Sequence, residues 1–268
     1  DEPMSINDIN NAAAAMNQLK ARYEGFLNDA DAQIAVRQAA YDNLSADLKG
    51  IIRTELTKEL YVDNTVAVPS GSSYQTLAQA LGALPRGSFA IIRLRTGQVH
   101  EINSHINVGG ITVDIGYYGP IADGKPIIKH NAGVDGGSNV MWGYTGHSCS
   151  VTINGCDIEL PTEKADPNLT WLNSRRSVFS GARGRERFAG FQTCTVTGGM
   201  ADVNLGLITV YESGYASVGL FVVTLDGPIS LIVSAPSGAF SVRKTAFTLA
   251  NGATETDGGT LGTNYLSN

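Results

Sequence analysis

Apolar residues recur at heptad spacing through the first sixty residues of the chain. Residues 5–60 contain no proline and only two glycines, and Ala, Leu, Gln, Glu and Lys, all good helix formers, fill much of the stretch. Steps of seven from Ile6 and from Ile9 meet an apolar residue at twelve of fourteen positions, the exceptions being Lys20 and Arg37. This spacing, sustained over seven heptads, predicts one long helix that forms a coiled coil.

The predicted helix has no partner of similar length in its own chain. About 55 helical residues extend on the order of 80 Å at 1.5 Å per residue, so we expect other copies to bury the apolar stripe. Ala, Ile, Leu and Tyr occur at both core positions without the β-branched bias of dimers, which favours a homotrimer. An amphipathic helix lying on the rest of the chain is the alternative. The residues predicted to form the trimer core are Ile6, Ile9, Met16, Tyr23, Leu27, Ile34, Tyr41, Leu44, Leu48 and Ile51.

Helix-start signals occur at two places. Ser5 precedes the long helix with Asp8 three positions later, a typical N-cap and an acidic first-turn residue. Ser72 and Gln75 resemble a capping box, and leucines at helical spacing follow them up to a Pro-Arg-Gly stop. The second signal predicts a short helix after a strand-and-turn linker at residues 61–73. Such a helix would close the open end of a stack of strands.

From residue 89 onward the helical period gives way to alternation of apolar and polar residues. Asp-Gly and Asn-Gly pairs punctuate this region, as is typical of tight turns between strands. Strands are predicted at residues 89–94, 110–115, 126–129, 150–160, 191–197, 207–212, 217–225, 229–234 and 239–249. Residues 161–187 interrupt the pattern and predict a long surface excursion, a common place for function.

Several predicted strands consist of two short alternations with a tight corner between them. Val151 and Ile153, for example, are followed by Cys156 and Ile158. The pattern favours a parallel β-helix, in which short strands joined by bends carry inward apolar residues; an antiparallel sandwich or jelly roll remains an alternative. We therefore predict a mainly β fold with three parts, a trimeric coiled-coil helix (1–60), a linker with a capping helix (61–88) and a β-helix-like body (89–268).

Composition narrows the possible partners. The net charge of −6 and the pI near 5.2 argue against nucleic acid or an anionic membrane as partner, and no apolar run is long enough to insert into a membrane. Charged residues make up only 16%, which buried subunit interfaces would explain.

The three cysteines, Cys149, Cys156 and Cys194, have no framework spacing and indicate reduced, buried thiols made in a cytosol. The spacing of His147, Cys149 and Cys156 fits no common zinc pattern, so no metal or cofactor is predicted.

The order of these segments resembles the tail fibres and tailspikes of bacterial viruses. Residues 73–87 read Ser-Tyr-Gln-Thr-Leu-Ala-Gln-Ala-Leu-Gly-Ala-Leu-Pro-Arg-Gly, which is similar to the lead-in helix that precedes a right-handed β-helix in that family. The resemblance implies a parallel homotrimer in the virion tail, made in the host cytoplasm. It implies other tail or baseplate proteins as partners at one end and a bacterial surface glycan at the other.

Glycan cleavage is one possible activity of such a protein. It requires two carboxylates about 5–10 Å apart, and a tailspike depolymerase therefore stays an alternative to simple attachment. The chain is shorter than the usual polysaccharide-cleaving tailspikes. The weak catalytic candidates are Asp157, Glu159, Asp202 and Glu212.

Glycan binding without cleavage needs only exposed aromatic faces with polar neighbours. Aromatic residues in glycine-rich or loop segments are the candidates, although packing in a core or an interface would explain each of them equally well. The glycan-binding candidates are Tyr117, Tyr118, Trp142, Tyr144 and Trp171. A purely structural fibre connector is a third hypothesis, against which no sequence feature speaks.

Overall fold

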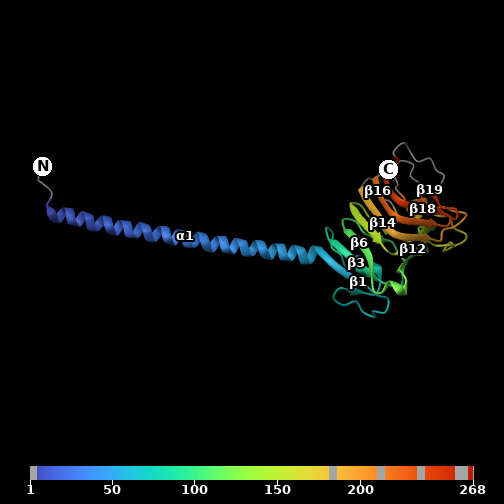
Figure 1. Cartoon of the computed structure of the whole chain (residues 1–268), viewed down its shortest axis with the longest axis horizontal. Helices are drawn as coiled ribbons and strands as arrows, with labels where there is room; N and C mark the ends of the chain where they lie inside the picture. The colour runs from blue at the N-terminus through green and yellow to red at the C-terminus, as the bar shows by residue number, and fades with distance from the viewer. Residues whose placement is uncertain (1–4, 181–185, 210–214, 234–238, 257–264, 268) are drawn as a thin grey trace. The chain divides into compact units, whose positions relative to one another are not determined.

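The computed structural model describes residues 5–180, 186–209, 215–233, 239–256 and 265–267. The chain divides into two compact units, residues 1–54 and 55–268. Nearly all of helix α1 (Ile6–Leu56) forms the first unit, and the described strands belong to the second, the body (Figure 1). The prediction of a mainly β chain with one long N-terminal helix is confirmed.

Helix α1 begins where the sequence predicts. The Ser5 hydroxyl accepts a hydrogen bond from the Asp8 backbone N–H, and the Asp8 carboxylate accepts one from the Ser5 backbone N–H, both at 3.2 Å. The reciprocal cap satisfies two N–H groups that have no partner within the helix, and its carboxylate complements the positive end of the helix dipole.

The predicted end of the helix at residue 60 is wrong. The helix ends at Leu56, and β1 (Thr57–Val62) pairs in parallel with β3 (Phe89–Arg95). Leu60 and Val62 point into the core and are buried, whereas Thr57 and Glu59 point outward. Leu60 therefore fits both a helical spacing and a strand alternation, and pairing with β3 decides between them.

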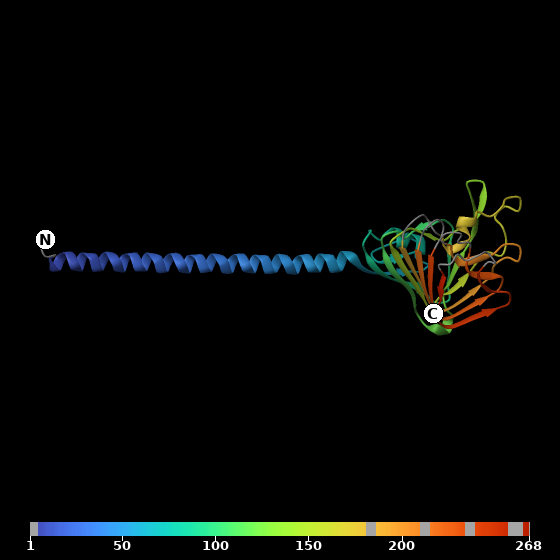
Figure 2. The same cartoon turned by 90° about the horizontal axis from the view of Figure 1, so that it is seen from above.

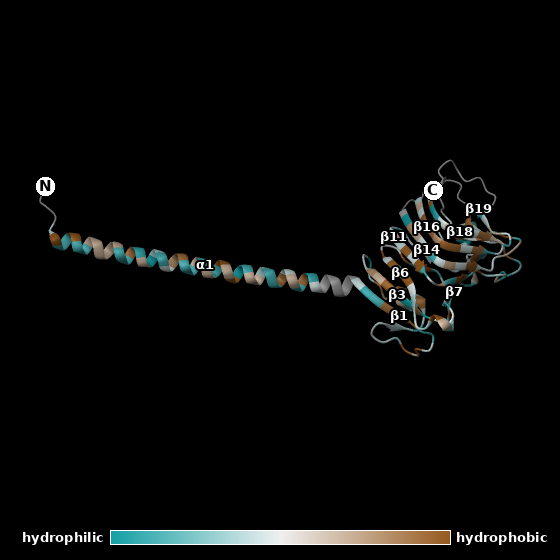
Figure 3. Ribbon diagram, in the orientation of Figure 1, coloured by the Kyte–Doolittle hydropathy of each residue, from teal (hydrophilic) through white to brown (hydrophobic). Residues whose placement is uncertain are grey.

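The apolar side chains along α1 are exposed in the single chain, where they alternate with hydrophilic residues (Figure 3). Among the predicted trimer-core residues, the exposed fraction runs from 43% at Leu27 to 78% at Ile6. The side chain of Ile51 lies outside the described residues. No described helix is long and apolar enough to cross a membrane.

Two further apolar residues widen this stripe. Leu19 and Phe26, which the heptad steps miss, lie three residues after Met16 and Tyr23 and are exposed as well. Side chains three apart are neighbours on a helix surface. The first half of α1 therefore presents a broader apolar face than an a/d seam alone.

In the body, the strands pair in parallel and form three rows (Figures 1 and 2). The first row is β1, β3, β6 (Thr112–Tyr118), β11 (Cys149–Asn154), β14 (Glu186–Thr197), β16 (Tyr215–Asp226), β18 (Ala239–Ala250) and β20 (Tyr265–Ser267). The second row is β4 (Val99–Ile102), β7 (Ile127–His130), β12 (Asp157–Glu159) and the second halves of β14, β16 and β18. The third row is β5 (Ile106–Asn107), β10 (Tyr144–Thr145), β13 (Ser177–Phe179), β15 (Leu205–Ile208), β17 (Ile229–Ile232) and β19 (Thr254–Thr256). Since these rows are parallel, the antiparallel sandwich and jelly roll are excluded.

A sharp corner divides the long strands between the first and second rows. Thr193, Val222 and Ala246 occupy equivalent positions in β14, β16 and β18 and have positive φ values of 55°, 55° and 53°. Gly155, with φ of 67°, occupies the same position between β11 and β12. This left-handed residue turns the chain where the sequence predicts a corner between two short alternations. Val222 is β-branched and strained there.

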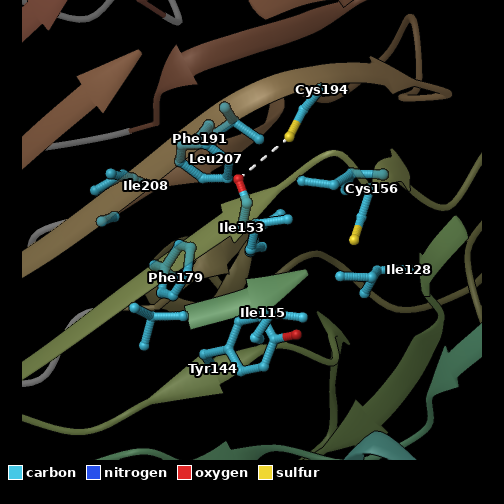
Figure 4. Close-up of a cluster of buried hydrophobic side chains, with 14 of the residues drawn as sticks. Ile115, Ile128, Tyr144, Ile153, Cys156, Phe179, Phe191, Cys194, Leu207 and Ile208 are labelled. Atoms are coloured by element: carbon cyan, nitrogen blue, oxygen red, sulfur yellow. Dashed lines mark hydrogen bonds between the residues drawn. The ribbon is translucent and has the colours of Figure 1, made fainter. Parts of the chain in front are cut away.

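The interior contains aligned apolar side chains from successive strands (Figure 4). Ile115, Ile153, Phe191 and Leu220 are register partners on β6, β11, β14 and β16, and all four are buried. The three cysteines are free and buried, as predicted, and burial raises the pKa of the Cys194 thiol to about 11. Parallel, in-register stacking thus gives the body a continuous core of its own.

The short helix α2 (Leu77–Gly82) is capped by residues other than those predicted. The predicted capping pair Ser72 and Gln75 is wrong, because β2 (Ser73–Tyr74) continues the sheet beside β1. Thr76 is the N-cap instead, in a reciprocal capping box with Gln79. The helix contacts β1, β2, β4 and β5, which include one strand from each of the three rows.

Two excursions leave the rows. One is the antiparallel hairpin of β8 (Ala132–Asp135) and β9 (Ser138–Met141), which projects from the sheets in lime green in Figure 2. The other starts at residue 161 and ends at β13, so the predicted extension to residue 187 is wrong. Asn139 joins the two excursions, because its side chain donates to the carbonyls of Asp166 and Leu169 and accepts from the Asp166 N–H, all at 2.7 to 2.9 Å.

Candidate functional site

Three of the five aromatic residues predicted to bind glycan keep some exposure. Tyr117 and Tyr118 lie at the end of β6, and Trp142 lies between β9 and β10. The Tyr118 ring packs edge-to-face against Tyr61 at 5.3 Å, and the Trp142 ring packs against His105 at 4.8 Å. Tyr117 is the only one of the three without a described aromatic neighbour.

The other two predicted aromatic residues are unsuitable for stacking on a ligand. Tyr144 is completely buried, and its ring is stacked on Phe179 with centroids 5.1 Å apart. Trp171, within the second excursion, is only 9% exposed, belongs to the buried core and forms a β-bridge with Asn139. Both predictions are wrong because the two side chains fill the core instead of facing solvent.

Three of the four predicted carboxylates lie within 4 Å of a lysine ammonium. Asp157 accepts hydrogen bonds from the Lys125 ammonium at 3.2 Å and from the Thr195 backbone N–H at 3.0 Å. Glu159 lies 3.1 Å from Lys129. Asp202 lies 3.8 Å from Lys164 on an exposed segment, and Glu212 lies outside the described residues. Separate lysine partners are typical of surface ion pairs.

A polar hollow of about 390 Å³ lies where the second excursion leaves β12. Glu159 and Glu163 both line it, together with Lys129 and Lys164. Asn131 and Asn103, which sequence reasoning missed, also line it and are joined by a hydrogen bond of 2.6 Å from the Asn131 amide nitrogen to the Asn103 amide oxygen. This hollow therefore brings two carboxylates, Glu159 and Glu163, to one cavity.

A second hollow of about 320 Å³ lies on the outer face of the first row, and we call it the Phe188–Phe221 groove. Phe188 on β14 and Phe221 on β16 are 41% and 50% exposed and line the same hollow. Both point outward because their strand neighbours Ala189 and Leu220 point into the core. The groove therefore has an aromatic wall on each side.

Two glycines form the floor of this groove. Gly190 and Gly219 are register partners on β14 and β16, and both occupy outward positions of their strands. A Cβ atom added at Gly219 would lie 3.6 Å from the Phe188 Cζ, and one added at Gly190 would lie 3.3 Å from the Phe188 Cε1. The Phe188 ring thus lies close above both glycines, and side chains here would occupy the groove.

Polar side chains complete the lining. Thr152 on β11 and Arg243 on β18 are the register neighbours of the two glycines, so they close the ends of the floor. Gln192 and Thr245 lie beside Phe221 on the neighbouring strands. Apolar faces with a few hydrogen-bonding groups are the usual composition of a ligand site, and aromatic faces of this kind stack on sugar rings.

Sequence reasoning missed the groove because it depends on register. The groove is lined by residues of neighbouring strands, and residues paired across these strands lie 24 to 38 positions apart in the sequence. A weak signal was present: Val218 and Leu220 set the inward phase, so Gly219 and Phe221 had to point outward.

Comparisons of the chain with family models, with curated proteins and with solved structures yield no match. The function therefore has to be argued from the geometry of the helix, the body and the groove.

Proposed function

We propose that this chain is the protomer of a homotrimeric tail fibre of a bacterial virus, which attaches the virion to a glycan on the bacterial surface. The observation that carries the proposal is the apolar stripe of the 51-residue helix α1, which is exposed from end to end among the described side chains. A helix of this length cannot keep such a stripe in water, so we infer that parallel copies bury it.

The breadth of the stripe supports three copies. Leu19 and Phe26 extend the apolar face beyond the a/d seam, and each additional helix in a bundle covers a wider face of its neighbours. Tyr23 and Tyr41 at core positions need the larger central space of a trimer more than the narrow seam of a dimer.

We also infer that the body is a right-handed parallel β-helix. Its three rows, its αL corners at Gly155, Thr193, Val222 and Ala246 and its in-register core support a chain that makes one coil after another. The right-handed sense follows the strong preference of parallel crossover connections. Such a rigid body is a suitable support for a binding surface, and the Phe188–Phe221 groove is the surface we assign to the glycan.

The oligomer is tested by changing one core residue. Ile34→Asp places a charge in the seam, where it has no partner and costs several kcal/mol to desolvate, so we expect the trimer to dissociate in sedimentation equilibrium. Ala35→Asp introduces the same charge one position away on the outer face of the helix and should leave the trimer intact. Equal dissociation by both variants, or by neither, would contradict the proposed seam.

Attachment is tested with bacterial surface polysaccharides, namely capsule and lipopolysaccharide from a panel of strains. The full-length protein should bind at least one of them, and Phe221→Ala should weaken that binding by about tenfold, since stacking contributes on the order of 1 kcal/mol and more when it excludes water. Phe89→Ala is the matched control, because Phe89 lies on the same outer face in β3 and is 45% exposed. A trimer that binds none of the polysaccharides would instead fit a structural connector.

Glycan cleavage is a second candidate, and the polar hollow favours it because Glu159 and Glu163 line the same cavity. If the hollow cleaves glycan, reducing ends should appear on incubation with the bound polysaccharide, and Glu159→Gln or Glu163→Gln should abolish their release. Glu101→Gln, outside the lining of this hollow, serves as the control. Binding without any release of reducing ends would limit the protein to attachment.

A further inference from the structure

The Phe188–Phe221 groove has one charged residue in its lining, and its position indicates what kind of sugar would bind. Arg243 lies on β18 as the register partner of Gly219, so its side chain starts one strand spacing, about 4.8 Å, from the glycine floor. The residue is exposed, and among the described residues none forms an ion pair with it. A guanidinium is thus available at one end of an aromatic-walled groove.

We propose that the groove binds an acidic saccharide, a sugar that carries a carboxylate or a phosphate, and that Arg243 recognises its negative group. This inference rests on the proposed attachment to glycan. The planar guanidinium matches carboxylate and phosphate oxygens in two parallel hydrogen bonds, a geometry that a hydroxyl of a neutral sugar does not offer. Thr152, Gln192 and Thr245 hydrogen-bond the remaining hydroxyls, while the rings of Phe188 and Phe221 contact the apolar faces of the sugar.

The charge of the whole chain makes this arginine important. A net charge of −6 repels a polyanionic glycan at a distance, so an acidic sugar needs a local positive group to bind. No carboxylate lines the groove in the described part of the chain, so the positive charge of Arg243 is not neutralised there. Other cations of the body are engaged elsewhere, for example Arg95 with Asp63 at 2.5 Å and Lys129 with Glu159 at 3.1 Å.

The probes are oligosaccharides bearing uronic acid, sialic acid or phosphate, each measured beside its carboxyl-reduced or dephosphorylated counterpart. We expect the full-length trimer to bind at least one acidic probe about tenfold or more tightly than the neutral counterpart, because charge-assisted hydrogen bonds are about twice as strong as neutral ones. Arg243→Gln should remove this difference while leaving weak binding to both forms. Arg86→Gln, which removes an exposed arginine outside the groove, is the matched control and should bind as the wild type does.

A third variant tests whether the groove itself is the site. Gly219 has no positive φ and an ordinary contact distance to Phe188, so Gly219→Leu fills the groove without backbone strain. It should abolish binding of the acidic probe while the melting temperature of the body stays close to that of the wild type. Retained binding by Gly219→Leu would overturn the assignment of the groove.

The outcomes separate this inference from the proposed function. Equal binding of acidic and neutral probes, or an acidic preference that survives Arg243→Gln, overturns the role of Arg243 and leaves glycan attachment standing. Binding to no probe by an intact trimer contradicts attachment as well. A change in oligomeric mass on Phe221→Ala or Gly219→Leu would show that a second copy of the chain covers the groove, and this too would overturn the proposal.

Discussion

Helix α1 and the body solve the same problem, the burial of apolar side chains, in different ways. The body buries its own: Ile115, Ile153 and Phe191 stack in register in one chain. In α1 the apolar residues at heptad spacing are exposed in the single chain. The difference teaches that one chain is enough to bury the core of the body, whereas the proposed burial of the α1 stripe needs further copies and would make the stability of the helix depend on protein concentration.

The largest effect should come from opening the core of the body. Phe191→Ala removes a buried ring and should lower the free energy of unfolding of the body by about 3–5 kcal/mol, because it loses contacts and leaves a cavity. Chemical denaturation monitored by intrinsic fluorescence measures this loss. Phe188→Ala on the same strand points outward and should cost much less, and equal costs for both would contradict the assigned faces of β14.

Acid should weaken the body and spare the helix. Burial lowers the pKa of His130 to about 4, and burial together with Arg175 lowers that of His105 to about 4, whereas the unfolded value is about 6.5. The unfolded state binds more protons between these values, so stability is complete above about pH 6.5 and falls as the pH drops toward 4. The loss for the fully buried His130 is about 3 kcal/mol at most.

All four histidines lie in the body, so acid acts as a probe that separates the two regions. Thermal melts at pH 7 and pH 4.5 should show the transition of the body shifting downward, and His130→Leu should reduce that shift. An unchanged shift in this variant would show that other groups dominate the acid response.

Dilution should weaken the helix and spare the body, the reverse of the effect of acid. For a trimer, tenfold dilution weakens association by about 1 kcal/mol per chain, so the helical circular dichroism signal should melt at a lower temperature while the transition of the body stays in place. Melts over a hundredfold range of protein concentration provide the measurement. A helix transition that does not respond to dilution would mean that α1 is stabilised within one chain.

The smallest effect should be a gain in stability. Val222 has a φ of 55°, a conformation that costs a residue with a Cβ about 1–2 kcal/mol. Glycine avoids this cost, but it also raises the entropy of the unfolded chain, which offsets about half of the gain in stability. Val222→Gly should therefore stabilise the body by about 0.5 kcal/mol in denaturant titration. Gly155→Val at the equivalent corner should destabilise the body, because its φ is positive and an added Cβ would lie 2.5 Å from the Tyr117 Cε1. A loss of stability in Val222→Gly would contradict the strain assigned to the corner.

The sequence predicts those features that depend on local spacing. Heptads predict α1, the N-cap signal predicts its start at Ser5, and alternation predicts the regions of β3, β6, β7, β11, β12, β14, β16 and β18 and the corners in them. The predicted strands at 207–212 and 229–234 match β15 and β17 only in part, because residues 210–212 and 234 lie outside the described residues. Where one residue satisfies two patterns, as Leu60 does, the boundary depends on the pairing of β1 with β3, which local spacing does not contain. The strands that the sequence does not predict have two to four residues and are too short to carry a clear period: β4, β5, β8, β9, β10, β13, β19 and β20.

The candidate site was the least predictable part, for a related reason. Tyr144 and Trp171 look like surface aromatics in glycine-rich or loop segments, yet Tyr144 is stacked on Phe179 and Trp171 packs into the same core, so both are buried. Phe188, Gly219 and Arg243 meet only because three strands align in register. A groove built from partners in successive strands becomes visible only when that register is known.

The most direct test of the central claim is the mass of the 268-residue chain in solution, measured by light scattering over a range of concentrations. Burial of the α1 stripe by parallel copies predicts a particle of three chains, each of 28.2 kDa. A monomer of 28.2 kDa at every concentration would contradict the account, because the apolar stripe of α1 would then remain exposed to water.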